Sequence, residues 1–94
     1  MKIYISGAIT KNAAYKAQFE KAEREVAAQG HTPLNPARLE DAFPPLAYED
    51  YMHIDFALID LADCVYMLHG WELSAGAQRE RAYAMQHGKR IIEA

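Results

Sequence analysis

Asp55 is an acidic residue on an otherwise apolar face of a predicted helix. It continues the one-sided spacing of that face, whose other members are Tyr51, Leu58 and Ala62. A carboxylate that faces the core is costly unless it is paired, hydrogen-bonded or protonated, and burial raises its pKa toward the range of a general acid. Asp55 is therefore a candidate catalytic acid. A structural carboxylate that accepts backbone hydrogen bonds fits the same pattern equally well.

Glu80 repeats this arrangement, because it shares a helix face with the small residues Ala77 and Ala84. Glu80 and Asp55 each lie near the start of their helices, and at about 1.5 Å per residue both are about 8 to 10 Å along the axis. Two carboxylates that face one pocket can carry out displacement at an anomeric carbon, one as nucleophile and one as acid/base. The pattern alone favours the alternative, a solvated helix face on which Glu80 pairs with nearby arginines.

Two loops have the residue types that bind anions. In "SGAIT" (6–10), Ser6 and Gly7 follow a strand and precede a helix, where backbone N–H groups and hydroxyls can hold an anion. Ser74 and Gly76 offer a second helix start, although capping alone explains Ser74. Trp71, in the loop before it, can stack on a base, but a hydrophobic plug or a dimer contact explains it equally well.

Metal and thiol chemistry have no support in the sequence. The four histidines are scattered, and no HxH, HxxxH or CxxC spacing occurs, so we expect no metal site and no cofactor. The lone Cys64 lies inside an apolar run, where it cannot form an internal disulfide and is a poor candidate for a nucleophile.

The elements that position these residues alternate between strand and helix. Strands are predicted at 2–6, 31–35, 64–68 and 89–93, and Pro33 indicates that the second is an edge strand. Helices are predicted at 12–29, 48–61 and 74–87, with Gly30 and Gly88 ending the first and the third. The segments 36–47 and 69–73 are predicted to be loops, and the proline-rich 36–47 is a candidate lid or binding segment.

This alternation predicts an α/β fold for residues 1–94. We expect a small Rossmann-like (flavodoxin-like) three-layer α/β/α domain, with a four-stranded parallel sheet in the order 2-1-3-4. Ligands of such sheets bind outside the C-terminal strand ends, at the switch point between strands 1 and 3. The loops 6–10 and 69–74 flank that point.

Composition limits the partners. A net charge of −3 lacks the basic patch that binding to polymeric nucleic acid requires, and no apolar run is long enough to span a membrane. "MKIYISG" is too short for a signal-peptide core, so we expect a cytoplasmic location. With 94 residues the domain is near the size at which self-association adds stability, and we expect a homodimer or a higher homo-oligomer.

Three segments resemble the nucleoside 2-deoxyribosyltransferase superfamily, including its small phage- and bacteria-associated members of undefined function. They are "KIYISGAIT", "HIDFALIDLADCVYML" and "SAGAQRERAYAMQHGKRII", which span nearly the whole chain in the family's order. The third is the most specific. The family places a catalytic Glu on the helix after the third strand and a Gly–Lys pair eight and nine residues later, which correspond to Glu80, Gly88 and Lys89. The family's acidic residue on the preceding helix corresponds to Asp55.

The resemblance implies cleavage of the N-glycosidic bond of a deoxynucleoside or its monophosphate. Glu80 would attack C1′ to form a glycosyl-enzyme, Asp55 would help to protonate or position the leaving base, and water or a second base would resolve the intermediate. The substrate, a small-molecule nucleotide or nucleoside, would be bound by residues of the first and third segments and of the loop between strand and helix: Tyr4, Ser6, Gly7, Ile9, Trp71, Ser74 and Gly76.

The sequence departs from the family's transferases in two ways. They carry an Asp six residues before the catalytic Glu, whereas this chain has Ser74, which resembles the branch that hydrolyses 2′-deoxynucleoside 5′-monophosphates and uses a Ser for the phosphate. Family enzymes are also longer, with a C-terminal segment that completes a neighbouring subunit's site, which strengthens the expectation of an oligomer. The alternative hypothesis is a non-catalytic nucleotide-binding or sensing module of the same fold.

Overall fold

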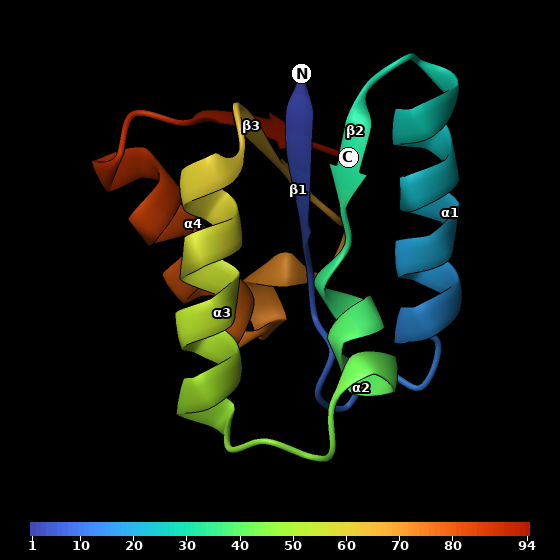
Figure 1. Ribbon diagram of the computed structural model, residues 1–94, viewed down its shortest axis with the longest axis vertical. Coiled ribbons are helices and arrows are strands. Elements are labelled where there is room, and N and C mark those ends of the chain that lie inside the picture. The colour runs from blue at the N-terminus through green and yellow to red at the C-terminus, as the bar shows by residue number, and fades with distance from the viewer.

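A four-stranded parallel sheet lies between two layers of helices in the computed structural model, which describes residues 1–94 (Figure 1). The strands are β1 (Lys2–Ser6), β2 (Thr32–Leu34), β3 (Cys64–Met67) and β4 (Arg90–Glu93), in the order β2-β1-β3-β4. The long helices are α1 (Tyr15–Ala28), α3 (Tyr48–Leu61) and α4 (Ala75–Gln86). The predicted fold class, strand order and edge position of β2 are confirmed.

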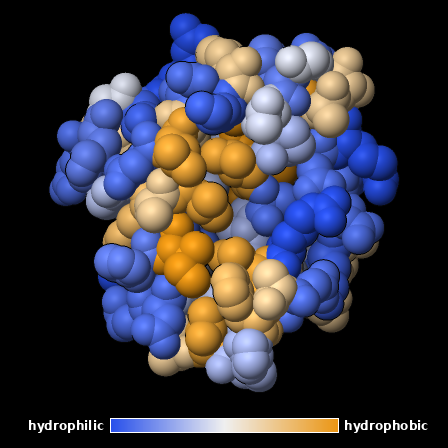
Figure 2. Space-filling model, viewed as in Figure 1, coloured by the Kyte–Doolittle hydropathy of each residue, from blue (hydrophilic) through white to orange (hydrophobic).

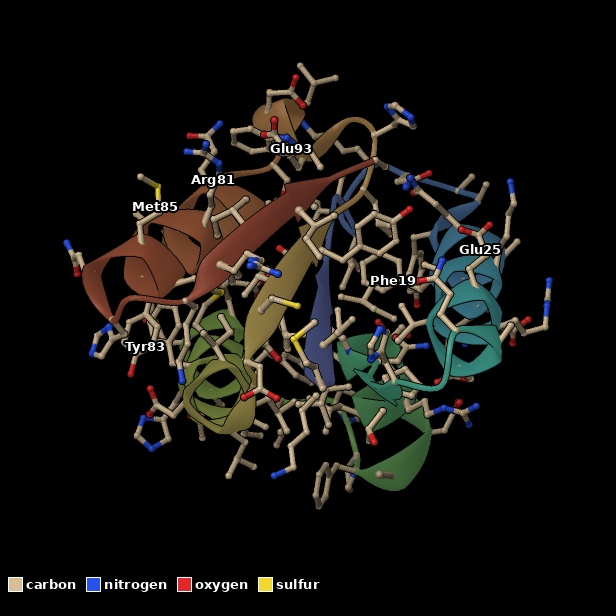
Figure 3. All side chains as sticks on the ribbon, turned by 90° about the horizontal axis from the view of Figure 1, so that it is seen from above. Phe19, Glu25, Arg81, Tyr83, Met85 and Glu93 are labelled. Atoms are coloured by element: carbon tan, nitrogen blue, oxygen red, sulfur yellow. The ribbon has the colours of Figure 1, made fainter.

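The alternation of side chains along β1 divides the core into two faces. Ile3 and Ile5 pack in the clusters that contain residues of α1, whereas Tyr4 packs with residues of α3 and α4. Phe19 points from α1 toward the sheet (Figure 3) and is fully buried against Ile5. Ser6 lies on the same face as Tyr4 and bonds to α4. The first strand therefore presents one hydroxyl-bearing face to the two helices that carry the candidate carboxylates.

The proline-rich segment differs from its prediction as a loop. Its first part folds into a 3-10 turn (Pro36–Arg38) followed by the short helix α2 (Leu39–Ala42). Asn35 caps this turn, because its side chain accepts a hydrogen bond from the backbone N–H of Ala37, and Pro36 fits the first helical position. The loop prediction was wrong there, because proline breaks the interior of a helix but can begin its first turn. The segment 69–73 likewise contains a 3-10 turn, Trp71–Leu73.

The buried stripe of α3 is shifted by one residue from the predicted one. Its buried members are Met52, Asp55 and Ile59, whereas Tyr51 and Leu58 are only half-buried at its margins. Asp55 remains in the middle of the stripe, so its predicted inward position holds. No helix of the chain has the length and apolar character needed to cross a bilayer.

Candidate active site

Glu80 is a buried carboxylate held by two hydroxyl groups of β1. Only 6% of the residue is exposed. Ser6 Oγ donates a hydrogen bond to Glu80 Oε1 at 2.6 Å, and Tyr4 Oη donates one to Glu80 Oε2 at 3.1 Å. Ala77 and Ala84 flank it on the buried face of α4, and their small side chains let the helix lie close to the sheet. Each carboxylate oxygen therefore has one fixed donor from a central strand.

The arginines beside Glu80 do not neutralise it. Arg79 pairs with Glu49 on α3, with Nη1 2.8 Å from Oε1. Arg81 points to β4, with Nε 3.8 Å from Glu93 Oε1 (Figure 3). The interpretation of Glu80 as a solvated residue paired with arginines is thus wrong, because Glu80 is buried and the neighbouring arginines lie against other carboxylates.

Asp55 supplies a second buried carboxyl group from α3, with 7% of the residue exposed. Its Oδ1 atom is buried and accepts no hydrogen bond from a donor of the chain. Burial raises the pKa of Asp55, and the neighbouring Glu80 and Tyr4 offset part of that rise. Burial thus favours the protonated form of this carboxyl group.

Glu80 and Asp55 share protons as a coupled pair. Burial raises the pKa of Glu80 well above its usual range, Asp55 raises it further, and the hydrogen bonds from Ser6 and Tyr4 lower it. Burial, together with the two carboxyl groups, also raises the pKa of Tyr4, so its hydroxyl stays a donor. The neighbouring carboxyl group of Asp55 raises the pKa of Glu80, whereas Glu80 lowers that of Asp55. We call Tyr4, Ser6, Asp55 and Glu80 the carboxylate cluster.

A cavity of about 660 Å³ opens above the cluster at the C-terminal edge of the sheet, a volume within the usual range of small-molecule sites. Both carboxylates line it, and so do four of the predicted binding residues: Gly7, Ile9, Ser74 and Gly76. Tyr4 and Ser6 are fully buried and do not line the cavity, so they affect it only through their hydrogen bonds to Glu80. Trp71 does not line the cavity, because it packs against the core with the guanidinium of Arg81 5.0 Å from its ring centroid.

The start of α4 forms one wall of the cavity. Ser74 caps the helix, since its Oγ accepts a hydrogen bond from the backbone N–H of Ala77 at 3.1 Å. Ala75 and Gly76 both line the cavity, and in the first turn of a helix their N–H groups have no intrahelical acceptor. Free amides and the helix dipole together favour an anionic group at this wall.

Several lining residues were not predicted individually, although Pro36, Glu40 and Leu46 belong to the segment 36–47 that was a candidate lid or binding segment. Four of the exposed ones form the group that we call the rim: Lys11, Glu40, Tyr48 and Leu73. Lys11 is the only cation among the lining residues, forms no ion pair, and is the only non-glycine residue with a left-handed backbone, at φ 63°. The one available signal was topological, because loops after the strands of a parallel sheet meet at one edge.

The rim is partly apolar. Leu73 is 91% exposed and Tyr48 is half exposed. Figure 2 shows hydrophobic residues gathered down the middle of one face of the molecule, with hydrophilic flanks. An apolar surface around a polar floor is the common composition of a small-molecule site.

Two solved structures share the fold of this chain. The chain is similar to the CMP N-glycosidase BcmB of Clostridium botulinum, with a TM-score of 0.71 and 22% identity over 99% of this chain and 67% of that one. It is also similar to a 2-deoxyribosyltransferase of Bacillus psychrosaccharolyticus, with a TM-score of 0.77 and 23% identity over 99% of this chain and 71% of that one. This chain therefore has the α/β fold of these two enzymes.

Within that fold class, residues 1–93 match the family model described as "Domain of unknown function (DUF4406)". The chain belongs to this family. A search of curated proteins gave no match.

Proposed function

We propose that the protein cleaves the N-glycosidic bond of a 2′-deoxynucleoside 5′-monophosphate, with Glu80 as nucleophile and Asp55 as acid and base. The observation that carries this proposal is the carboxylate cluster at the floor of the cavity, where Glu80 has a donor on each oxygen and Asp55 lies beside it. The fold shared with an N-glycosidase and a deoxyribosyltransferase supports it. So does the resemblance of Glu80, Gly88 and Lys89 to the motif of the deoxyribosyltransferase superfamily.

The first step needs one proton on the pair. For attack this proton lies on Asp55, and the ionised Glu80 is stabilised by the hydroxyl groups of Ser6 and Tyr4. Glu80 then forms a bond to C1′ while the bond from C1′ to the base nitrogen breaks. Asp55 gives its proton to the leaving base, and the sugar stays on Glu80 as an ester.

In the second step a water molecule attacks C1′ of this ester. Asp55, now ionised, takes a proton from the water, and Glu80 leaves as a carboxylate. The products are the free base and 2-deoxyribose 5-phosphate. If a second base takes the place of the water, the same intermediate gives base exchange, so hydrolysis and transfer differ only in the acceptor.

The wall at the start of α4 is the proposed phosphate site. Ser74, Ala75 and Gly76 line the cavity one to two turns before Glu80 on the same helix. A 5′-phosphate bound to their amides and to the Ser74 hydroxyl places C1′ of the sugar toward Glu80. The cation of Lys11 adds to the attraction of the cavity for an anionic substrate.

The proposal is tested with a panel of the common 2′-deoxynucleoside 5′-monophosphates and the matching nucleosides, with and without an added acceptor base. We expect free base from the monophosphates, at a higher rate than from the nucleosides. Thermal unfolding with each compound measures binding separately from turnover. Binding without release of base would support the alternative of a nucleotide-binding module, and neither binding nor release would overturn both.

A homo-oligomer and a cytoplasmic location remain predictions from the sequence. The exposed Leu73 and Tyr48 at the rim give an apolar surface that self-association would cover. Sedimentation velocity of the purified chain measures the assembly directly.

A further inference from the structure

Glu40 is a carboxylate of the rim, and only one of its two oxygens is bound by neighbouring side chains. It lies on α2 and lines the same cavity as Glu80 and Asp55. The hydroxyl of Tyr15, at the start of α1, donates a hydrogen bond to Glu40 Oε2, and Lys16 Nζ lies 3.9 Å from the same oxygen. The bond with Glu40 is the main cause that raises the pKa of Tyr15 to about 12, so the donor is retained across the physiological range.

The other oxygen of Glu40 has a different environment. No donor of the chain bonds to Oε1, and the ion-pair contact of Lys16 is made to Oε2. Two contacts from α1 therefore fix the orientation of the carboxylate while leaving one acceptor for a ligand in the cavity. A charged acceptor that is already oriented loses little conformational freedom when it binds a donor.

The order of the sheet places Glu40 on the far side of β1 from the start of α4. Helix α2 follows β2, which pairs with one edge of β1, and α4 follows β3, which pairs with the other. A nucleotide with its phosphate at Ser74 and its C1′ at Glu80 thus extends its base toward α2. Tyr51 and Leu46 line the cavity and offer flat or apolar surfaces for that base, whereas the hydroxyl of Tyr48 lies beside Gly76 at the start of α4.

We propose that Glu40 is a specificity residue that accepts a hydrogen bond from the exocyclic amino group of the leaving base, so that cytosine and adenine are favoured over uracil and hypoxanthine. This inference rests on the proposed function for its substrate class. Uracil and hypoxanthine carry a carbonyl oxygen at the position where cytosine and adenine carry the amino group. A carboxylate opposite a carbonyl oxygen is repulsive, so Glu40 selects both by attraction and by rejection.

The test compares kcat/KM for matched pairs, dCMP with dUMP and dAMP with dIMP, in the wild type and in Glu40→Gln. A hydrogen bond to a partly exposed charged group gives a preference of about tenfold for the amino base. In Glu40→Gln this preference falls to about twofold or less, because an amide donates to a carbonyl as readily as it accepts from an amine. The matched control is Asp41→Asn, which removes the neighbouring exposed charge outside the cavity and leaves the preference unchanged.

Two further measurements separate the ways in which the inference can fail. Calorimetric binding of the same nucleotides to Glu80→Gln reads the amino preference without turnover. A preference in this binding, together with no base release by the wild type, would leave this inference standing and remove the proposed function. If kcat/KM fell equally for both members of each pair in Glu40→Gln, Glu40 would contact the sugar, and the inference would be overturned. A wild type without the preference, or a preference that survives in Glu40→Gln, would overturn it as well.

Discussion

The carboxylate cluster and the rim belong to one cavity but are built from different kinds of structure. Tyr4 and Ser6 of the cluster are fully buried on a central strand, and Asp55 and Glu80 lie on the two long helices packed against it. Lys11 and Glu40 of the rim are exposed and lie on a loop and on a four-residue helix. In the proposed mechanism, rigid elements thus hold the groups that need fixed geometry, and short exposed segments hold the groups that select the ligand.

The two regions also differ in how their charges are stabilised. The cluster contains two carboxyl groups with no cation beside them, and their pKa values are raised mainly by burial. The carboxylate of the rim, Glu40, is held by the cation of Lys16 and the hydroxyl of Tyr15. A site for proton transfer needs groups that change charge, whereas a site for recognition needs groups that keep it. Single substitutions in each region test whether these two roles are separate.

The largest expected effect is the loss of turnover in Glu80→Gln. The amide cannot form the ester with C1′, so we expect release of base to fall by about a thousandfold or more. The measurement is base release by chromatography under single-substrate conditions. Glu93→Gln, which makes the same change at an exposed position of β4, should retain wild-type turnover. Equal rates for Glu80→Gln and the wild type would show that the cluster is not catalytic.

Asp55→Asn should have a smaller effect that depends on the leaving group. Removing a general acid costs about 100-fold to 10,000-fold for a base that must be protonated. We expect a much smaller loss with 7-methylguanine, a base that leaves without protonation from its already cationic nucleotide. Asp60→Asn, near the C-terminal end of the same helix and outside the cavity, serves as the control. An equal loss with both kinds of leaving group would contradict the role of acid.

Much of the cluster could be predicted from sequence because periodicity determines it. The inward position of Asp55 follows from helical spacing, and Tyr4 and Ser6 share one face because of the period of a strand, whereas spacing alone favoured a solvated position for Glu80. The shared hydrogen bonds to Glu80 could not be predicted, since they join residues more than 70 positions apart.

Most of the rim could not be predicted in the same way. Glu40 lies in a segment without a periodic pattern, and its role depends on Tyr15 and Lys16 of another helix. For Trp71 the sequence left base stacking and a hydrophobic plug equally open, and its packing against the core fits the second. Side chains of loops are placed by tertiary contacts and not by local spacing, so the sequence alone leaves such alternatives open.

Ser74→Asp tests the proposed phosphate site at the start of α4. Asp caps a helix as well as Ser does, so the fold of α4 is preserved, but its charge repels a phosphate bound at the same helix start. We expect kcat/KM for the monophosphate to fall by about tenfold or more, while that for the nucleoside changes little. Ser74→Thr is the uncharged control. A proportional loss on both substrates would place the phosphate elsewhere.

The smallest effect is on stability, and its sign depends on pH. A carboxyl group whose pKa is raised by folding contributes its full stability below the pKa of the unfolded chain and loses it as the pH rises through the folded pKa. Because Gln does not ionise, Glu80→Gln does not lose stability in this way as the pH rises. We expect the variant to gain roughly 1 to 2 kcal/mol over the wild type at pH 8, and little at pH 4, in urea denaturation. A difference that is constant with pH would mean that Glu80 is not destabilised by burial.

The most direct test of the central claim is the mass of the protein during turnover. The wild type is mixed with a 2′-deoxynucleoside 5′-monophosphate, quenched in acid within the first turnovers, and its peptides are analysed by mass spectrometry. We predict a deoxyribosyl phosphate adduct on the peptide that contains Glu80, absent in Glu80→Gln. Base release with no adduct on Glu80, or an adduct on Asp55 in its place, would contradict the role of Glu80 as nucleophile.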